Sequence, residues 1–600
     1  MNNSKNSVRT LTMLALLVAM SIVFSWVLSI STGFVRFNLG SLPVLLAALL
    51  FGPGAGFAVG AVADMIGGVL AGYAINPLIT LGAGAIGLVA GLAWQKLPGL
   101  RTGLRLQISV LLGHFVGSMV ITSLALRIFY GYPWATLAVR IPNALILAAV
   151  NTVLLRILLE NRTLMKMVKK VKRGITMNYE QAMEYIHAVQ WAGHKPGLTR
   201  TRTLLAALGD PHKQLRFVHV AGTNGKGSTA AMMASCLQAA GYRVGLYTSP
   251  FINRFNERIQ INGVQIPDEE LVKLVEQVKP AADAMEDVPT EFEIITALGM
   301  LYFAQQKCEI VVLEVGLGGT LDSTNVIDAP ECAVITALGM DHVKELGPTL
   351  GDIAAAKAGI IKEGCPVVSY GGVPEADAVI RRVAAEKHAE LTEVDFSRLK
   401  YEGGSLDAVE FDFDGLTDVH LPLIGSYQPR NAALAVTALR VMRTHGWNIP
   451  ESAIRTGLET VSWPGRFELL RHAPAFLLDG SHNAHGMRAT VQSLKDRFPG
   501  QKFVFLVSIM ADKDVDQMLS LLAPLAVRFV TVTAHTPRAM PAEVLAEHIR
   551  AYGCRAEAAD SIQAGVARAV ELGGEGPVCA LGTLYFSGDV RNAFAELVKG

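Results

Sequence analysis

The sequence predicts a multidomain chain with three parts in order. A six-helix all-α membrane domain comes first, then an α/β domain with a phosphate-binding loop (P-loop) and a parallel sheet, and last a smaller Rossmann-like α/β domain. Residues 11–159 are long apolar runs that contain one acidic residue, Asp64. A short apolar strand at 217–220 runs into a glycine-rich loop with a lysine. Beyond it, apolar β-runs alternate with helical stretches, which is typical of a parallel sheet.

Length and composition exclude several classes of protein. A chain of 600 residues is too long for one core. The net charge of +1 gives no global attraction to nucleic acid, so no nucleic-acid partner is expected. The six cysteines form no CxxC pair, which favours reduced cytosolic thiols over disulfides or a zinc site.

The apolar half predicts membrane spans, because a helix needs about 20 apolar residues to cross the bilayer. The expected spans are 11–31, 38–52, 55–73, 75–95, 106–128 and 134–158. The second is short and the glycine-rich stretch 51–91 blurs its neighbours, so five spans is the alternative. Many apolar runs follow the first, which indicates a span rather than a cleaved signal peptide.

Basic residues predict the orientation. They gather before the first span, between the fourth and fifth, and after the sixth, at Lys5, Arg9, Lys96, Arg101, Arg105, Arg162, Lys166, Lys169, Lys170, Lys172 and Arg173. Six spans place all three groups on one side, which the positive-inside rule makes cytoplasmic. We therefore expect a multi-pass protein of the cell membrane with its N-terminus and its C-terminal half in the cytoplasm. The basic linker 161–177 is interpreted as a topology anchor rather than a segment bound to lipid headgroups.

Charged residues at membrane depth mark function by default. Asp64 and Arg140 fall within predicted spans, while Arg36 and Arg127 fall near the outer face, where long cations can also simply snorkel. We take Arg36, Asn38, Arg127 and Arg140 as candidates to bind a substrate.

Short motifs in this half resemble a known transporter component. They are Gly33–Gly40, Leu42-Pro43, Phe51-Gly52-Pro53 and Val59–Asp64. Residues 10–160 resemble the substrate-binding (S) component of energy-coupling-factor (ECF) vitamin transporters, most of all its folate-specific member. The resemblance implies that Ala15 and Ala19, spaced AxxxA, contact a membrane coupling subunit. This half has no ATP-binding motif, so pumping would need separate ATPase subunits.

The second half begins its chemistry with a phosphate loop. Its residues, Gly222, Thr223, Asn224, Gly225, Lys226, Gly227 and Ser228, lie between the strand and a predicted helix at 229–240. Backbone N–H groups and a helix N-terminus then face phosphates, Lys226 supplies a point charge, and Ser228 is placed to bind magnesium. Position 220 is Val where the usual motif has Gly; GTNGK is the form seen in ATP-dependent amide ligases, including the muramyl ligases.

Further motifs narrow the resemblance. In chain order they are Tyr247–Pro250, Asn256–Ile259, Glu314–Gly319, Asp322–Asn325, Asp341-His342, Lys357–Lys362, Gly425–Ala432, Trp463–Arg466 and Asp479–Asn483. Residues 178–598 resemble folylpolyglutamate synthase and dihydrofolate synthase. This implies an ATP-dependent ligase that adds L-glutamate to folate or dihydropteroate, with Mg²⁺.

The resemblance also implies residue roles. Ser249, Glu314 and His342, with Ser228, are the expected magnesium ligands, and Lys357 matches a lysine that the family carbamylates. Lys226, His342 and Lys357 are the expected catalytic residues. Asn431, Arg466, Asp479 and His482 match residues that hold ATP across a domain interface, and Thr248, Pro250 and Arg258 belong to the substrate loop. The sequence departs from the family pattern at Phe251, Thr320, Ala356 and Ala484; Thr320, in place of Arg, affects the charge balance near the acceptor.

The expected domains are 1–160, transmembrane and vitamin-binding; 161–177, the linker; 178–464, ATP-binding; and 465–600, C-terminal. The combined hypothesis is that folate enters through the membrane half and that added glutamates then trap it as a polyanion. The alternatives are a membrane-anchored ligase with no transport role, transport of a different vitamin, and a transport protein with an inert ligase half. A muramyl ligase is disfavoured by the Thr-Ser-Pro and Glu-Arg-Ile motifs.

Overall fold

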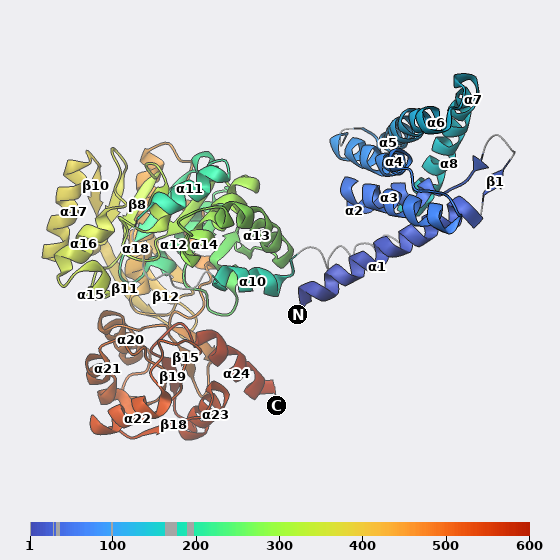
Figure 1. Cartoon of the computed structure of the whole chain (residues 1–600). Coiled ribbons are helices and arrows are strands. Elements are labelled where there is room, and N and C mark those ends of the chain that lie inside the picture. Colours follow the sequence, from blue (N-terminus) through green and yellow to red (C-terminus); the bar gives the residue numbers. More distant parts are fainter. Residues whose placement is uncertain are drawn as a thin grey trace. The chain divides into compact units, whose positions relative to one another are not determined.

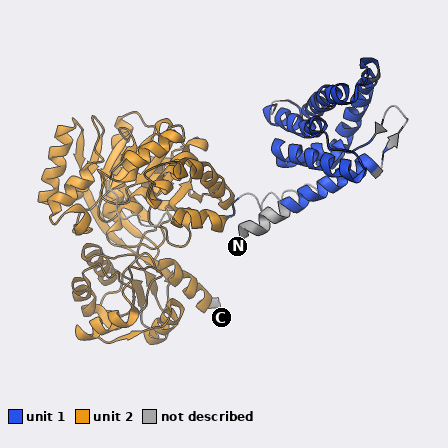
Figure 2. Cartoon of the chain, viewed as in Figure 1, with its two compact units in different colours: residues 1–178 blue, residues 179–600 orange. Residues whose placement is uncertain are grey.

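The structure is a computed structural model that describes residues 2–27, 29–31, 36–97, 100–161, 177–188 and 197–599. It divides into two compact units, Met1–Asn178 and Tyr179–Gly600 (Figure 2). The cations predicted for the linker, Arg162 to Arg173, lie outside the described residues, as does the side chain of Arg36.

The described part of the first unit is helical, apart from one short pair of antiparallel strands (Figure 1). Four helical segments are long and apolar enough to cross a membrane: 53–70, 77–96, 102–130 and 140–160. Leu11–Trp26 and Ser41–Phe51 are shorter apolar helices. The elements are α1 (Asn2–Ile22), β1 (Ile30–Ser31), β2 (Arg36–Phe37), α2 (Ser41–Phe51), α3 (Pro53–Leu70), α4 (Pro77–Lys96), α5 (Thr102–His114), α6 (Ser123–Tyr130), α7 (Trp134–Ala138) and α8 (Arg140–Glu160). A helix thus overlaps each predicted span, and four of the helical segments are long enough to cross a membrane.

Glycines bring α3 and α4 into backbone contact. A Cβ atom added to Gly87 would lie 2.5 Å from the backbone of Gly56, and one on Gly60 would lie 2.4 Å from the carbonyl oxygen of Ala83. Membrane helices associate through such close packing, because lipid gives them no hydrophobic drive to do so. The glycines that obscured the span boundaries in the sequence therefore serve helix packing.

Two predicted boundaries differ from the structure. The predicted span 134–158 is broken at Val139 into α7 and α8, so Arg140 begins a helix instead of lying inside one. Pro142 has no N–H to bond the carbonyl of Ala138, which explains why the helix does not run through. The predicted span 11–31 also ends early, because β1 and β2 pair antiparallel after it.

In the second unit an eight-stranded sheet carries the phosphate loop. Its order is β10-β9-β8-β3-β7-β4-β5-β6, parallel from β10 to β4 and antiparallel beyond. The strands are β3 (Phe217–Ala221), β4 (Val244–Tyr247), β5 (Ile259–Ile261), β6 (Val264–Gln265), β7 (Ile310–Glu314), β8 (Cys332–Ile335), β9 (Val367–Ser369) and β10 (Leu391–Glu393). The helices around it are α10 (Tyr179–Ala188), α11 (Thr199–Ala207), α12 (Lys226–Ala239), α13 (Asp268–Asp283), α14 (Glu291–Gln305), α15 (Val343–Leu346), α16 (Leu350–Ala358) and α17 (Pro374–Glu386).

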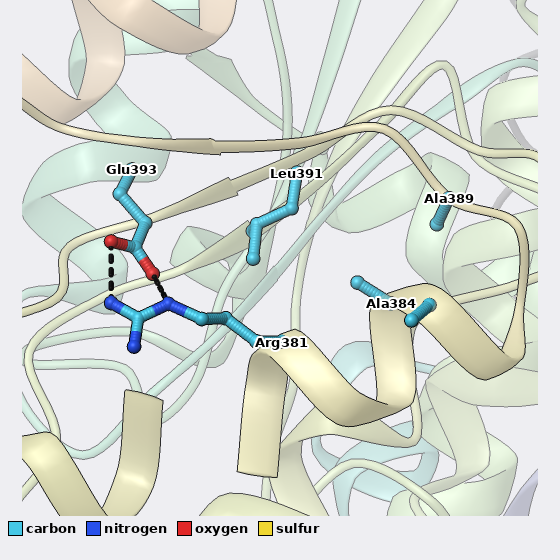
Figure 3. Close-up of a pocket in the computed structure, with 6 residues that line it drawn as sticks. Arg381, Ala384, Ala389, Leu391 and Glu393 are labelled. Atoms are coloured by element: carbon cyan, nitrogen blue, oxygen red, sulfur yellow. Dashed lines mark hydrogen bonds and ion pairs between the residues drawn. The ribbon is translucent and has the colours of Figure 1, made fainter. Parts of the chain in front are cut away.

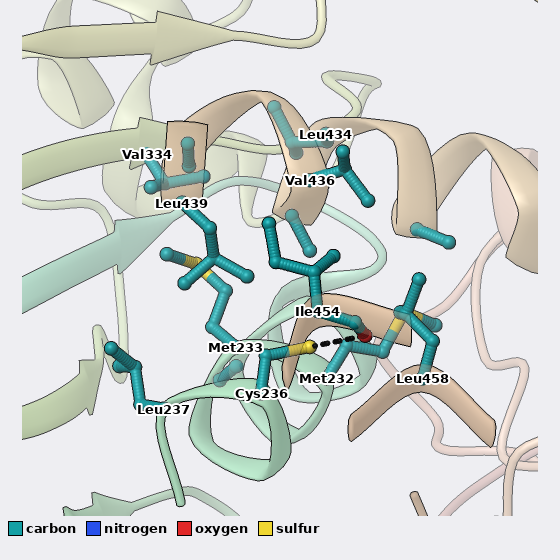
Figure 4. Close-up of a cluster of buried hydrophobic side chains, with 14 of the residues drawn as sticks. Met232, Met233, Cys236, Leu237, Val334, Leu434, Val436, Leu439, Ile454 and Leu458 are labelled. Atoms are coloured by element: carbon teal, nitrogen blue, oxygen red, sulfur yellow. Dashed lines mark hydrogen bonds between the residues drawn. The ribbon is translucent and has the colours of Figure 1, made fainter. Parts of the chain in front are cut away.

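A large apolar core lies on one face of this sheet, between it, two further helices and a small antiparallel sheet. The helices are α18 (Gln428–Thr444) and α19 (Glu451–Thr460); the sheet is β11 (Leu399–Gly404), β12 (Val409–Phe413) and β13 (Leu416–Leu421). Figure 4 shows Met232 and Met233 of α12 facing Leu439 and Ile454. The Cys236 thiol donates to the carbonyl of Ile454 at 3.3 Å. Phosphate-loop helix α12 is therefore anchored along its length.

The C-terminal part is a six-stranded sheet of order β14-β15-β19-β16-β17-β18, parallel apart from β14. Along β16, Phe503 and Phe505 pack on one face and Val504 and Leu506 on the other. The strands are β14 (Glu468–Arg471), β15 (Phe476–Leu478), β16 (Phe503–Val507), β17 (Ala526–Thr531), β18 (Ala556–Ala558) and β19 (Val578–Leu581). The helices are α20 (Ala484–Arg497), α21 (Val515–Leu522), α22 (Ala542–Ala551), α23 (Ile562–Gly573) and α24 (Ser587–Lys599). The strand expected at 217–220 is present as β3, and both large sheets are mainly parallel, so the predicted parallel α/β architecture is confirmed.

Candidate active site at the carboxyl ends of the parallel strands

Four neighbouring strands, β8, β3, β7 and β4, end at one edge of the large sheet. The phosphate loop follows β3, Glu314 is the last residue of β7, Ser249 follows β4, and His342 follows β8. In open parallel sheets this edge is where ligands bind. The topology thus brings together residues that are up to 120 positions apart.

The phosphate loop needs its glycines. Gly222 and Gly225 have φ angles of 154° and 84°, which side chains rarely adopt. A Cβ on Gly222 would lie 1.8 Å from Thr336 Oγ1, and one on Gly225 would lie 2.6 Å from Asn431 Oδ1. Thr336 Oγ1 donates to the carbonyl of Asn224 at 2.7 Å and so fixes the loop from behind.

Lys226 is folded back over this loop. Its Nζ donates to the carbonyls of Gly222 and Thr223 at 3.1 and 3.2 Å. Burial lowers the pKa of Lys226, while the charge of Glu314 opposes that shift. Carbonyl oxygens are weak partners for an ammonium compared with phosphate oxygens. Lys226 is therefore poised to exchange them for a nucleotide phosphate.

Glu314 is a buried carboxylate, 3% exposed, beside this lysine. Burial raises the pKa of Glu314 above its usual value. The charge of Lys226 and a hydrogen bond from the Ser249 N–H (3.0 Å) oppose that rise. Magnesium prefers oxygen ligands, and a carboxylate supplies them. Among the described residues no group of three or more His, Cys, Asp or Glu could hold a metal. The predicted magnesium ligands include only two residues of these types, one carboxylate and one imidazole, and the other two ligands are hydroxyls.

A hydrogen-bond chain connects the loop to α18. Asn431 Nδ2 donates to Gln428 Oε1 at 2.9 Å, and Gln428 Nε2 donates to Ser228 Oγ at 3.3 Å. All three residues are buried. The sequence did not predict a role for Gln428. It indicated only that this residue lies inside the motif Gly425–Ala432.

Lys357, in the last turn of α16, approaches the loop from another side. Its Nζ donates to the carbonyl of Gly222 at 2.8 Å. Burial, aided by the charge of Lys226, lowers the pKa of Lys357 to about 7. A substantial fraction of this amine is therefore neutral at physiological pH, unlike an ordinary lysine.

Asp341, which follows β8 of the eight-stranded sheet, contacts the part of the chain that carries the six-stranded sheet. It accepts from Lys513 Nζ at 2.6 Å and from Asn483 Nδ2 at 2.8 Å, and His482 Nε2 lies 3.6 Å away. Burial raises its pKa, but the hydrogen bond from His482 and the charge of Lys513 together hold it well below the usual range. Neighbouring His342 has φ 51°, and burial lowers its pKa to about 4. Lys513 is a functional candidate that sequence reasoning missed.

The phosphate loop itself also contacts the C-terminal part. Asn224 Nδ2 donates to His485 Nδ1 at 2.7 Å and to Asn483 Oδ1 at 3.2 Å. The positive charge of Arg466 adds to the lowering of the Lys226 pKa and opposes the burial that raises the pKa of Glu314, so this guanidinium acts on the same site.

Asp479 and His482 are held mainly within their own domain. The Asp479 carboxylate accepts from the Phe467 N–H at 2.9 Å, from Ser481 Oγ at 2.5 Å and from Thr490 Oγ1. His482 Nδ1 lies 2.9 Å from the carbonyl oxygen of Gly480.

The predicted substrate loop, residues 248–258, directly follows β4. Its ends are joined, because the Thr248 N–H donates to the carbonyl of Arg258 at 3.0 Å, and Pro250 lies between them. The guanidinium of Arg258 lies 5.2 and 5.8 Å from the ring centroids of Phe251 and Phe255. Its Nε is buried without a hydrogen-bond partner in the described part of the chain, and burial lowers its pKa. Such a group fits a role in binding an anionic ligand.

The departure at Thr320 has a local explanation. Its Oγ1 donates to the carbonyl of Ala356 at 3.0 Å, and its N–H bonds the same oxygen at 2.8 Å. Thr320 therefore fastens the loop after β7 to α16, a contact that adds no charge to the site.

In the membrane unit, two of the predicted substrate residues make local hydrogen bonds. Asn38 Oδ1 accepts from the Gly40 N–H at 3.0 Å, and Arg127 Nη1 donates to the carbonyl of Tyr132 at 3.2 Å. Arg140 Nε is buried and has no hydrogen-bond partner among the residues described. Asp64 Oδ2 accepts from Thr80 Oγ1 at 2.7 Å.

A buried polar cluster of the membrane unit was not predicted. Asn151 Nδ2 lies 2.8 Å from Ser41 Oγ and 3.1 Å from His114 Nε2. His114 Nδ1, Asn151 Oδ1 and Asn143 Oδ1 are buried and unpartnered within the described helices. Each is a polar residue within an apolar run, and that was the signal available in the sequence.

A surface hollow of about 440 Å³ lies away from the strand ends that carry the site. It is formed by α17 and edge strand β10 (Figure 3). An ion pair between Arg381 Nε and Glu393 Oε1, 2.7 Å long, spans it. None of the predicted site residues lines this hollow.

Family models match three segments of the chain. Residues 5–164 match the S component of the ECF-type riboflavin transporter, residues 220–439 the Mur ligase middle domain, and residues 465–581 the glutamate ligase domain of Mur ligases. The predicted fusion of an S component with a ligase is confirmed. The matching S-component model is named for riboflavin, whereas the predicted likeness was to the folate-specific member.

Curated relatives and solved structures match the second unit. The dihydrofolate synthase/folylpolyglutamate synthase of Bacillus subtilis is 40% identical over 427 residues, 69% of this chain and 98% of the relative. The folylpolyglutamate synthase of Lacticaseibacillus casei is 39% identical over 430 residues, 69% of this chain and 98% of the relative. The Mycobacterium tuberculosis folylpolyglutamate synthase complexed with ADP is similar with a TM-score of 0.64 at 30% identity, over 69% of this chain and 98% of that one. An FPGS–AMPPCP–folate complex matches with a TM-score of 0.62 at 37% identity, over 70% of this chain and all of that one.

Proposed function

Because the chain belongs to the family of folylpolyglutamate and dihydrofolate synthases, we propose that it joins L-glutamate to folate or dihydropteroate at the expense of ATP. The observation that carries this proposal is the convergence of Lys226, Glu314 and Lys357 on one phosphate loop at the carboxyl ends of parallel strands. The N-terminal S component makes it a membrane protein.

The reaction must activate a carboxylate before an amine can attack it. The acceptor's carboxylate oxygen attacks the γ-phosphorus of ATP, which forms an acyl phosphate and releases ADP. The glutamate amine then attacks the acyl carbon, and phosphate leaves as the amide forms. Such transfer depends mainly on positioning and charge neutralisation. Lys226, released from the carbonyls of Gly222 and Thr223, would hold the transferred phosphate, and the N–H groups from Gly222 to Ser228 would hold the rest.

We propose that the magnesium ligands are Ser228, Ser249, Glu314 and His342. Buried carboxylate Glu314 and the low pKa of His342, which keeps its imidazole neutral, fit a cation site. Bound magnesium would neutralise charge on the phosphates. Lys357 would be carbamylated: its neutral amine adds to CO₂ and loses a proton, which gives a carboxylate-like group beside the loop. The pKa of about 7 supports this reaction.

The ATP site is completed across a domain interface. We propose domains at 178–464 and 465–600, the latter Rossmann-like, with Asn431, Arg466, Asp479 and His482 holding the nucleotide. Asp341 and Asn224 already bridge to the C-terminal domain, which supports a site closed between them.

Thr248, Pro250 and Arg258 form the acceptor site of the proposal. The unpartnered guanidinium nitrogen of Arg258 would pair with an acceptor carboxylate.

A ligation assay tests the proposed activity. The purified full-length chain is given ATP, glutamate and each acceptor, and the products are identified by mass spectrometry. Lys226→Ala should lose activity at least 100-fold, with Lys495→Met as an exposed control. Absence of product with every acceptor would refute the proposal.

For the membrane half, domain 1–160, we propose six crossings with both termini in the cytoplasm and the linker 161–177 on that side. Ala15 and Ala19 would contact an ECF coupling subunit that works with separate ATPases. Both lie on the exposed side of α1, whereas Leu17 is buried. Labelling of single introduced cysteines in sealed membranes tests the topology. We expect Tyr132→Cys to be labelled from outside and Thr102→Cys only after permeabilisation.

The vitamin of the membrane half is proposed to be folate, so that import and ligation act on one molecule. Polyglutamylated folate is too charged to recross the bilayer, and fusion keeps the ligase near the point of entry. Riboflavin is the second candidate, favoured by the matching family model. Arg140, which has an unpartnered nitrogen, and Arg36, Asn38 and Arg127 are the proposed contacts.

Titration of the full chain with both vitamins separates these candidates. A folate site lost in Arg140→Ala but retained in Arg258→Ala belongs to the membrane half. Riboflavin binding that Arg140→Ala abolishes would overturn the folate proposal and remove the reason for trapping. If neither vitamin binds at an Arg140-dependent site, the chain is a membrane-anchored ligase.

A further inference from the structure

The substrate loop is held in place by a helix to which the proposed reaction gives no role. Helix α10 is the first described element of the second unit, and α8, which ends at Glu160, is the described helix that precedes it in the chain. Two buried residues, Ala182 and Ile186, dock it. At its C-terminal half, Tyr185 donates to Asp283 Oδ1 of α13 at 3.0 Å.

The N-terminal end of α10 holds the loop directly. Tyr179 Oη donates to Asn256 Oδ1 at 2.6 Å. Asn256 is 1% exposed, and its Nδ2 donates to the carbonyl of Ile266 at 2.6 Å and to Asp268 Oδ1 at 3.0 Å. The amide of Asn256 is therefore bonded on both sides, and Tyr179 supplies the donor for its oxygen.

Other contacts reinforce this attachment. The guanidinium of Arg254 lies 5.9 Å from the Tyr179 ring centroid and pairs with Asp268 at 2.7 Å. Near the other end of α10, the His187 ring meets Phe255 edge-on, with centroids 6.3 Å apart. Helix α10 thus contacts two adjacent residues of the loop, Phe255 and Asn256.

These residues control the part of the loop that faces the ligand. Phe255–Arg258 form one 3₁₀ turn, so the position of Asn256 sets that of Arg258. The Arg258 carbonyl accepts from Thr248, and its guanidinium lies against Phe251 and Phe255. Its buried Nε has no partner in the described structure, which indicates a ligand there.

We propose that Tyr179 is a positioning residue for the acceptor substrate, acting through Asn256 on the turn that carries Arg258. The inference rests on the proposed role of the substrate loop. In this proposal α10, the first described element after the linker, supports the acceptor site. The nucleotide site has its own supports in Thr336 and Gln428, so it should not depend on Tyr179.

The test compares Tyr179→Phe with Tyr185→Phe in the full chain. Both variants remove one hydroxyl that donates to a side-chain oxygen from the same helix, but only Tyr179 reaches the loop. Tyr179→Phe leaves a buried acceptor without its donor, so we expect the KM for the acceptor to rise about tenfold. The KM for ATP and kcat should stay within about twofold. Hydrogen exchange should quicken at Phe255–Arg258 in Tyr179→Phe only.

The outcomes separate two failures. If Arg258→Ala raises the acceptor KM but Tyr179→Phe behaves like Tyr185→Phe, the positioning role is wrong and the loop assignment stands. If Arg258→Ala leaves the acceptor KM unchanged, the loop assignment itself is wrong. A rise in the KM of both substrates together with a lower melting temperature would make Tyr179 merely structural.

Discussion

Replacement of Lys513 by Met tests whether one ion pair holds the two ligase domains closed over ATP. Lys513 Nζ and Asp341 Oδ1 lie 2.6 Å apart, and each side chain is 9% exposed. A buried ion pair that loses one partner costs about 3 to 5 kcal/mol, because the remaining charge is left uncompensated. In Lys513→Met, Asp341 keeps Asn483 at 2.8 Å and His482 at 3.6 Å. We therefore expect the loss of the ion pair to cost less, about 2 to 3 kcal/mol.

Since the pair joins two domains, this energy is lost from the closed state rather than from either fold. At about 1.4 kcal/mol per factor of ten, kcat/KM for ligation should fall roughly 30- to 150-fold. Steady-state ligation assays measure the loss, and calorimetry should show little change in the melting of either domain. The control is Lys495→Met, an exposed lysine on α20 of the same domain.

Two results would refute this reasoning. A loss of less than threefold in Lys513→Met would mean that Asp341 is held adequately by Asn483 and His482 alone. A large loss that comes with unfolding of the C-terminal domain would mean that Lys513 stabilises a fold and not an interface.

Three further predictions concern other parts of the chain. Gly87→Val should destabilise the membrane unit in detergent melting without changing ligation kinetics, because its side chain would meet the backbone of Gly56; unchanged melting would contradict the α3–α4 contact. In CO₂-free buffer, the free energy of unfolding of the wild-type chain should rise relative to that of Lys357→Met as pH increases from about 7 to 10.5, by at most about 1.4 kcal/mol per pH unit. In this range the buried amine releases its proton while the amine of the unfolded chain keeps it. Denaturant titrations that show no such slope would exclude the low pKa. Ala19→Leu should abolish co-purification with an ECF coupling subunit while vitamin binding persists, and retained co-purification would place the contact elsewhere.

The sequence alone determined the strands and the chemistry that follows them. Runs such as Ile310–Leu313 are wholly apolar because strands of a buried parallel sheet are covered on both faces, and that pattern is local. The phosphate loop could also be predicted from the sequence, since the spacing of its glycines and lysine after an apolar strand is a local pattern. The division into a lipid-facing and a water-facing half follows from composition and needs no contacts at all.

Tertiary structure decided which distant groups meet. Nothing local distinguishes Lys513 from other lysines, and the motif around Gln428 does not reveal which group it contacts. Their contacts arise because folding places them against Asp341 and Ser228, more than 170 residues away. The same holds for Tyr179, whose partner Asn256 is 77 positions distant. The pKa of Lys357 was also beyond the sequence, because burial sets it and burial is a property of the packed fold. Sequence patterns encode what each segment does by itself, whereas a site built at the ends of several strands exists only once those strands are side by side.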